Sequence, residues 1–181
     1  SPGADKFREE QQAEFDLLGK LNRLSGIDYP DDPQLRARIK SYELAFRMQA
    51  ETPKLVDLSG ETKSVQSSYG IGEGDTDRNG RACLLARRVS EAGVRFVQVT
   101  MGGWDHHANI RGELPRTCGS VDKPIAGLLK DLKARGLLND TLGLWSGEFG
   151  RTPWSQDLSG TSPIETHGRE HQPDSFCAWL A

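Results

Sequence analysis

The fold expected for this chain depends on residues 94–100, which read Val-Arg-Phe-Val-Gln-Val-Thr. β-Branched and aromatic side chains are frequent in strands, and here apolar side chains would stand on both faces of the strand. A strand that is apolar on both faces is typical of a sheet covered by helices on each side. We therefore expect residues 94–100 to form a buried strand of such a sheet.

The segments on either side alternate between helix and strand. Periodic apolar residues predict a helix over 82–93 and a second helix over 121–136, with Asp122 as its N-cap. Residues 141–146 are expected to form the next strand. A strand, a helix and a strand in this order indicate parallel strands joined by a right-handed crossover. The expected fold class is therefore α/β, with a mostly parallel sheet flanked by helices.

Two charged helices are expected before this region. The first covers about 6–24, and the second begins at Pro33, with Asp32 as its N-cap. The apolar stripe of the second helix is expected to consist of Leu35, Ile39, Tyr42 and Phe46.

The domain organisation follows from these segments. Residues 1–51 form a helical segment, 52–79 a flexible polar connection, and 80–181 the α/β region. The glycines of 70–74 do not form a nucleotide loop, because no apolar strand precedes them and Glu73 and Asp75 would repel phosphate.

Composition excludes several classes of partner and scaffold. The chain has 181 residues and a formal net charge of −3, which gives no electrostatic basis for binding nucleic acid or an anionic membrane. Its apolar runs are short, so no membrane span is expected. The spacing of the cysteines fits neither a zinc ribbon nor a disulfide scaffold. Cys83 and Cys177 are expected to pack in apolar surroundings, and Cys118 to lie in a loop.

All histidines of the chain lie in two short loops, at 102–107 (GGWDHH) and 167–171 (HGREH). A third segment, GEFGRTP at 147–153, follows the strand expected at 141–146. Loops that follow parallel strands emerge at the same edge of a sheet, where α/β proteins bind their ligands. Imidazole and carboxylate together are ligands for a divalent transition metal. The sequence therefore predicts a metal site built from these loops.

Alternation along an extended loop places Asp105 and His107 on the same side, as two ligands of one ion. His106 would then point away, toward a substrate or a second carboxylate, although the two histidines could exchange roles. Glu148 and His171 are candidates to complete the ligand set. The alternatives are a salt bridge from Glu148 to its neighbouring arginine and a solvent-exposed hydrogen bond at His171.

Two arginines follow glycines in the candidate loops. The guanidinium groups of Arg151 and Arg169 could bind phosphate or sulfate oxygens and so act in catalysis. Alternatively, each arginine could hold its loop in place through a carboxylate.

Several stretches together resemble the DUF1501 family, bacterial proteins related to the alkaline phosphatase and sulfatase superfamily. The resemblance covers the chain from about Leu35 to its end. The matching stretches are YELAFRMQ at 42–49, CLLARR at 83–88, GVRFVQ at 93–98, GGWDHH at 102–107, DLK and RGLL within 131–138, GEFGRTP at 147–153 and GREHQP at 168–173.

This resemblance implies an alkaline phosphatase-like fold and metal-dependent hydrolysis of phosphate or sulfate esters. Asp105 and His107 look like ligands of one ion, Glu148 like a carboxylate for a second ion, and His171 like the late histidine ligand. Glu170 stands where the family usually has Asp, and is a further candidate ligand. The cofactors implied are divalent ions, with Zn, Mn, Mg and Ca as candidates.

The resemblance also places the nucleophile and the first metal carboxylate upstream of Ser1, so the chain is expected to be the C-terminal half of a larger domain. Small-molecule or glycan esters are the implied substrates, and a periplasmic or secreted location is implied by relatives with export signals. The alternative function is a non-catalytic binding or interaction protein that retains the fold.

Overall fold

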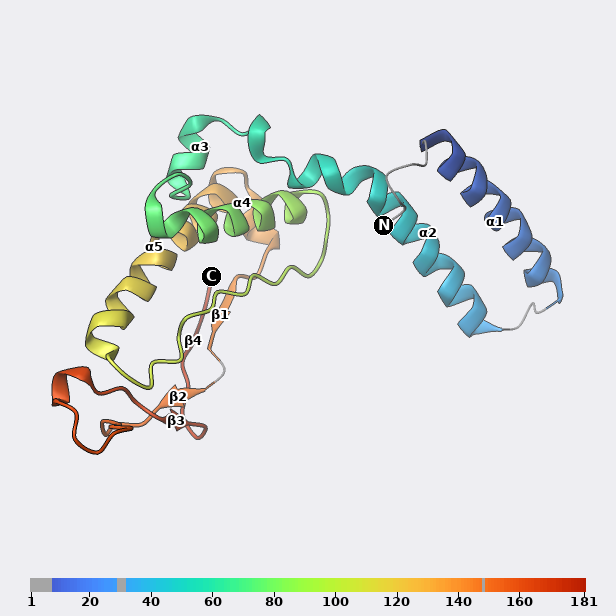
Figure 1. Cartoon of the computed structure of the whole chain (residues 1–181). Coiled ribbons are helices and arrows are strands. Elements are labelled where there is room, and N and C mark those ends of the chain that lie inside the picture. The colour runs from blue at the N-terminus through green and yellow to red at the C-terminus, as the bar shows by residue number, and fades with distance from the viewer. Residues whose placement is uncertain (1–7, 29–31, 148) are drawn as a thin grey trace. The chain divides into compact units, whose positions relative to one another are not determined.

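The computed structural model describes residues 8–28, 32–147 and 149–181. The chain divides into two compact units, one ending at Lys54 and one beginning at Leu55. The first unit contains α1 (Arg8–Asp28) and most of α2 (Pro33–Val56), and the second contains the remaining elements (Figure 1).

The start of α2 confirms the prediction made from the sequence. The Oδ1 atom of Asp32 accepts hydrogen bonds from the backbone N–H groups of Gln34, at 2.8 Å, and Leu35, at 3.0 Å. Pro33 occupies the first turn, where its missing N–H removes no helical hydrogen bond. Along the predicted stripe, Leu35 and Ile39 are half-buried and Tyr42 is exposed, whereas Phe46 lies outside the described side chains.

The second unit is built around two helices, α4 (Asp77–Glu91) and α5 (Ile110–Ala134), which pack against each other. Tyr69, Cys83 and Leu84 form the buried core beside them. α4 lies close to the backbone of Tyr69, because a Cβ atom at Gly80 would overlap the carbonyl oxygen of Tyr69. Short helices complete this helical part: η1 (Leu58–Gly60), α3 (Lys63–Ser68), η2 (Gly74–Thr76) and η3 (Leu137–Asp140).

Residues 52–79, expected as a flexible polar connection, contain the end of α2, all of η1, α3 and η2, and the beginning of α4. Tyr69 within this segment is fully buried, and its hydroxyl donates a hydrogen bond of 2.9 Å to Asp131 on α5. The segment therefore contributes to the core of the second unit.

A network of charged side chains holds the helical part together. Its centre is Arg87, whose side chain is only 2% exposed and forms ion pairs with Glu61 at 2.8 Å, Glu91 at 2.7 Å and Asp131 at 3.0 Å. We call this group the Arg87 network. Its members are Arg87, Arg88, Arg135, Glu61, Glu91 and Asp131. Equal numbers of positive and negative groups leave the network without net charge.

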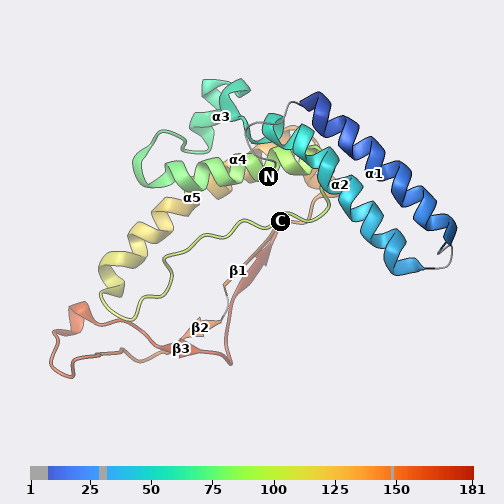
Figure 2. The same cartoon turned by 45° about the vertical axis from the view of Figure 1, so that its right-hand side comes forward.

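The prediction of a parallel sheet is wrong. In the described residues, the sheets are two antiparallel pairs, β1 (Leu144–Ser146) with β4 (Ala178–Leu180), and β2 (Gly150–Arg151) with β3 (His171–Gln172) (Figures 1 and 2). The structure therefore contradicts an α/β, alkaline phosphatase-like fold. It does place a strand within the predicted segment 141–146, but its partner comes from the other end of the region.

Residues 94–100 form no strand and belong to the segment that connects α4 to α5 (Figure 1). Val97 and Val99 line an apolar cavity of about 190 Å³ beside α5 and β1, whereas Phe96 is 80% exposed. The apolar pattern identified residues with a preference for extended backbone. It did not identify the partner, because strand pairing joins segments that are distant in sequence.

The helix predicted over 121–136 is longer than expected at its beginning. α5 starts at Ile110, so Asp122 lies inside the helix and the prediction that it forms the N-cap is wrong. The predicted end is confirmed, because the helix stops at Ala134 and Gly136 adopts a left-handed φ of 73°.

The cysteines are only partly as expected. Cys83 is buried, which confirms the prediction, and burial raises the pKa of its thiol to about 12. Cys177 is exposed, so its expected burial is wrong, and Cys118 lies on an exposed part of α5 rather than in a loop. Of the helices in the described residues, none combines the length and apolar character that crossing a membrane requires.

Candidate metal centre

Backbone hydrogen bonds join the two histidine loops. The N–H of Arg169 donates to the carbonyl of His106 at 3.0 Å, and the N–H of Asn109 donates to the carbonyl of Thr166 at 2.7 Å. The backbones approach so closely that a Cβ atom at Gly168 would overlap the backbone of His107. Only glycine fits at this position without displacing the other loop. The loops therefore meet although no parallel sheet brings them together.

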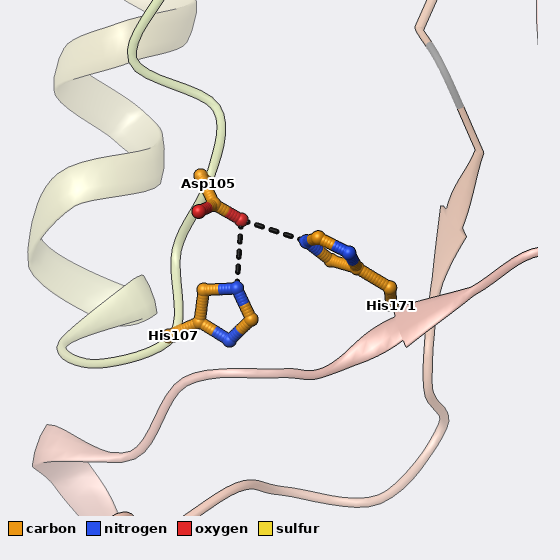
Figure 3. A group of neighbouring side chains, drawn as sticks. All are labelled: Asp105, His107 and His171. Carbon is orange, nitrogen blue, oxygen red and sulfur yellow. Dashed lines mark hydrogen bonds and ion pairs between the residues drawn. The ribbon is translucent and has the colours of Figure 1, made fainter.

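Asp105, His107 and His171 form a cluster at this junction (Figure 3). The Oδ1 atom of Asp105 lies 2.8 Å from Nε2 of His107 and 2.8 Å from Nε2 of His171. The candidate ligand atoms of the three residues all lie within 4.8 Å of one another. Among the described residues, these three side chains form the group that lies close enough together to share one metal ion.

The cluster is open to solvent on the side of Asp105. The Asp105 side chain is 67% exposed, whereas those of His107 and His171 are 28% and 33% exposed. The ring of His171 contacts two other rings, with centroid distances of 4.9 Å to Phe149 and 4.9 Å to His107. The rings are thus partly fixed by packing, while the carboxylate remains accessible to a solute.

Hydrogen bonds keep the carboxylates at this site ionised. The bond from His171, followed by that from Arg151, holds the pKa of Asp105 well below its usual range. The pKa of Glu170 is also lowered, chiefly because the backbone N–H of His171 donates to its carboxylate. Both groups therefore act as hydrogen-bond acceptors only at neutral pH.

The comparisons with known proteins concern the whole chain. A family model described as "Protein of unknown function (DUF1501)" matches residues 1–181. The chain belongs to the DUF1501 family. No curated protein and no solved structure matches it. The predicted DUF1501 membership is therefore confirmed, and the roles of individual residues in this DUF1501 chain must be argued from its geometry.

The structure separates the two histidines whose roles the sequence left open. His107 points to Asp105, whereas His106 is buried, at 8% exposure, and its Nε2 atom has no hydrogen-bond partner. Glu170 lies beside the cluster, with its Oε1 atom 3.8 Å from Nδ1 of His107. Glu148, the remaining candidate ligand, lies outside the described residues.

The two candidate catalytic arginines direct hydrogen bonds to the protein. Arg151 donates from Nη1 to the carbonyl of Arg169 at 3.1 Å, and from Nη2 to the carbonyl of Trp104 at 2.9 Å and to Oδ1 of Asp105 at 2.8 Å. Arg169 donates to the carbonyl of Thr152 at 2.7 Å. Arg151 thus links three segments and orients the carboxylate of the cluster.

Sequence reasoning missed Gln156. Its side chain lies between His107, at 2.8 Å, and Glu170, at 2.8 Å. Nothing around it in the sequence marks it, because its closeness to the cluster comes from the antiparallel bridge between Gln156 and Gly168. His167, in contrast, belongs to a loop motif but contacts Ser155 and Ser162 instead of the cluster.

Proposed function

We propose that this DUF1501 protein binds a divalent metal ion through Asp105, His107 and His171 and hydrolyses phosphate or sulfate esters. The observation that carries the proposal is the convergence of two imidazole nitrogens on one ionised, accessible carboxylate oxygen. The three residues come from two loops that lie on opposite sides of α5 in the sequence. Local sequence therefore does not explain why they meet.

The chemistry of the donors favours some ions over others. Two imidazole nitrogens and one carboxylate oxygen suit Zn²⁺ or Mn²⁺, whereas Mg²⁺ and Ca²⁺ prefer sites made of oxygen ligands. Among Zn, Mn, Mg and Ca, we therefore propose Zn or Mn. Such an ion, when bound, would stabilise negative charge on the phosphoryl or sulfuryl group of a substrate.

The ester class is what the resemblance to the DUF1501 family implies, through the relation expected between this family and the alkaline phosphatase and sulfatase superfamily. The same resemblance is the reason for proposing small-molecule or glycan substrates and a periplasmic or secreted location. The chain's own residues would orient the ligands: Arg151 holds Asp105, and the Phe149 ring restricts His171. Outward exposure of Asp105 leaves room for a substrate to approach.

The proposal is tested by metal binding and by turnover of aryl phosphates and aryl sulfates. The protein is stripped of metal with a chelator, and Zn²⁺ or Mn²⁺ is titrated back by calorimetry. We expect His107→Ala and His171→Ala each to weaken binding by more than the roughly 10–100-fold that loss of an outer partner costs. The matched control is His167→Ala, which removes an imidazole from the same loop but outside the cluster.

Metal-dependent turnover that disappears in His107→Ala and His171→Ala but persists in His167→Ala would support the proposal. A wild-type protein that binds neither ion, or that turns over both esters equally well without metal, would overturn it.

A second candidate is a metal-binding protein without catalytic activity, which acts through binding or interaction. It is favoured by the hydrogen bonds of Arg151, whose two terminal nitrogens both already donate to acceptors in the protein. This candidate predicts stoichiometric metal binding that depends on His107 and His171, together with no turnover of either ester.

A further inference from the structure

We infer that Gln156 is a positioning residue that holds the ring hydrogen of His107 on Nδ1 and so leaves Nε2 available as a metal ligand. The inference rests on the proposed function of the cluster. It follows from three contacts that together determine which atom in each pair carries hydrogen.

The first contact determines the orientation of the Gln156 amide. The ionised carboxylate of Glu170 is a hydrogen-bond acceptor only. Its Oε2 atom lies 2.8 Å from Nε2 of Gln156, while its Oε1 atom accepts the backbone N–H of His171 at 2.9 Å. A flipped amide would place two acceptor oxygens against each other. The NH₂ group of Gln156 must therefore face Glu170.

The second contact determines the tautomer of His107. Because the NH₂ group faces Glu170, the Oε1 atom of Gln156 faces His107, 2.8 Å from Nδ1. A carbonyl oxygen only accepts, so Nδ1 must donate and must carry a hydrogen. In a neutral ring the hydrogen on one nitrogen leaves the other with a lone pair. In the neutral ring of His107 the lone pair is therefore on Nε2.

The third contact shows where this lone pair points. Nε2 of His107 lies 2.8 Å from Oδ1 of Asp105, and a carboxylate oxygen is itself an acceptor. Two lone pairs at this distance repel each other unless a cation, either a proton or a metal ion, lies between them. A metal ion that binds here takes the place of the proton. With the opposite tautomer, Nε2–H would donate to Asp105 and occupy the position of the metal. Gln156 thus favours the tautomer that keeps the ligand position open, and it transmits the charge of Glu170 to the ring.

The backbone holds Gln156 in place independently of its side chain. Its N–H donates to the carbonyl of Gly168 at 2.8 Å, and its carbonyl accepts the N–H of Gly168 at 3.0 Å. A substitution of the side chain is therefore expected to leave the ribbon intact. Glu170 is also assigned a different role from the ligand predicted from the sequence, because its carboxylate orients the Gln156 amide.

The test uses Gln156→Leu in the full chain, with Zn²⁺ affinity measured by calorimetry. We expect the affinity to fall by roughly 10–100-fold, as for other outer partners of metal-bound histidines. The matched control is Gln172→Leu, in β3 of the same region, because both ring nitrogens of His107 already have partners and neither is Gln172. An affinity in Gln156→Leu that stays within about twofold of that of Gln172→Leu would overturn the inference.

A double-mutant cycle separates this role from a purely structural one. If Glu170 acts through Gln156, the losses caused by Glu170→Gln and Gln156→Leu will not add, because either change breaks the same relay. Fully additive losses would show that Glu170 acts on the metal by another route, and would overturn the relay.

Nitrogen NMR of the metal-free protein gives a readout that does not depend on metal binding. At about pH 8, where an ordinary imidazole is neutral, we expect hydrogen on Nδ1 of His107 in the wild type. In Gln156→Leu we expect it to move to Nε2, where Asp105 accepts it. A wild-type ring without hydrogen on Nδ1 would overturn the inference. If the wild type binds no metal, the proposed function fails, and this spectrum still decides the role of Gln156.

Discussion

The Arg87 network and the candidate metal centre both surround carboxylates with nitrogen donors, but they differ in burial and in how the charges are matched. Arg87 is 2% exposed and pairs with three carboxylates, each of which also pairs with another arginine. At the candidate metal centre, one carboxylate that is 67% exposed is contacted by three nitrogen atoms, from His107, Arg151 and His171. Similar contacts therefore occur in two very different environments.

This difference indicates different roles. Buried charges whose partners are all protein groups make the helices dependent on one another, and removing one charge leaves the others without compensation. An exposed carboxylate surrounded by imidazoles contributes little to folding, because solvent screens it. Its geometry is instead suited to holding a cation. Substitutions in the two regions can test whether stability resides in the network and ligand binding in the cluster.

The largest effect on stability is expected for Arg87→Ala. Removal of one partner from a buried ionic group typically costs about 3–5 kcal/mol, because the remaining charges stay buried without compensation. Urea denaturation followed by circular dichroism measures the change in free energy of unfolding. A loss below about 1 kcal/mol would show that the network is not buried in solution.

Gly168→Ala is expected to act on the metal centre with a smaller effect on the helical part. The added Cβ atom would overlap the backbone of His107, so the two histidine loops must separate. We expect Zn²⁺ binding to be lost while the helical circular dichroism signal is retained. Gly102→Ala is the matched control, because a Cβ atom there meets no atom within 4 Å. Equal zinc affinity in the two variants would contradict the close junction of the loops.

The stability contributed by Glu61 is expected to depend on pH. Burial alone raises its pKa, but hydrogen bonds from Arg88 and Arg87 outweigh burial and lower it. Its contribution is therefore present above its ordinary pKa, about 4.3, and is lost as the pH falls through the lowered folded-state value. The difference in free energy of unfolding between wild type and Glu61→Gln should shrink between about pH 5 and pH 3. A difference that is constant over this range would be inconsistent with the lowered pKa.

The smallest effect is expected for Arg81→Ala, on the same helix as Arg87. Its guanidinium pairs with Asp77 at 2.8 Å, but its side chain is 55% exposed. Exposed pairs of this kind contribute about 0–1 kcal/mol. Denaturation under the same conditions as for Arg87→Ala isolates the effect of burial. A loss as large as that of Arg87→Ala would remove the basis for distinguishing the two.

The sequence by itself determined the features that depend on neighbours along the chain. Asp32 and Pro33 start α2, and Gly136 marks the end of α5, because capping and left-handed φ angles are local properties. Cys83 on α4 is buried as expected. The gathering of the histidines in two loops is likewise a property of the sequence alone. Their role as ligands stays a prediction.

Only the tertiary structure decided the features that join distant segments. It paired β1 with β4 instead of with residues 94–100, because an apolar pattern specifies extended backbone but not the partner strand. It also distinguished His107 from His106, and it brought Gln156 to the ring of His107 through a bridge to Gly168. Each of these outcomes depends on contacts between residues far apart in sequence, and no local preference encodes them.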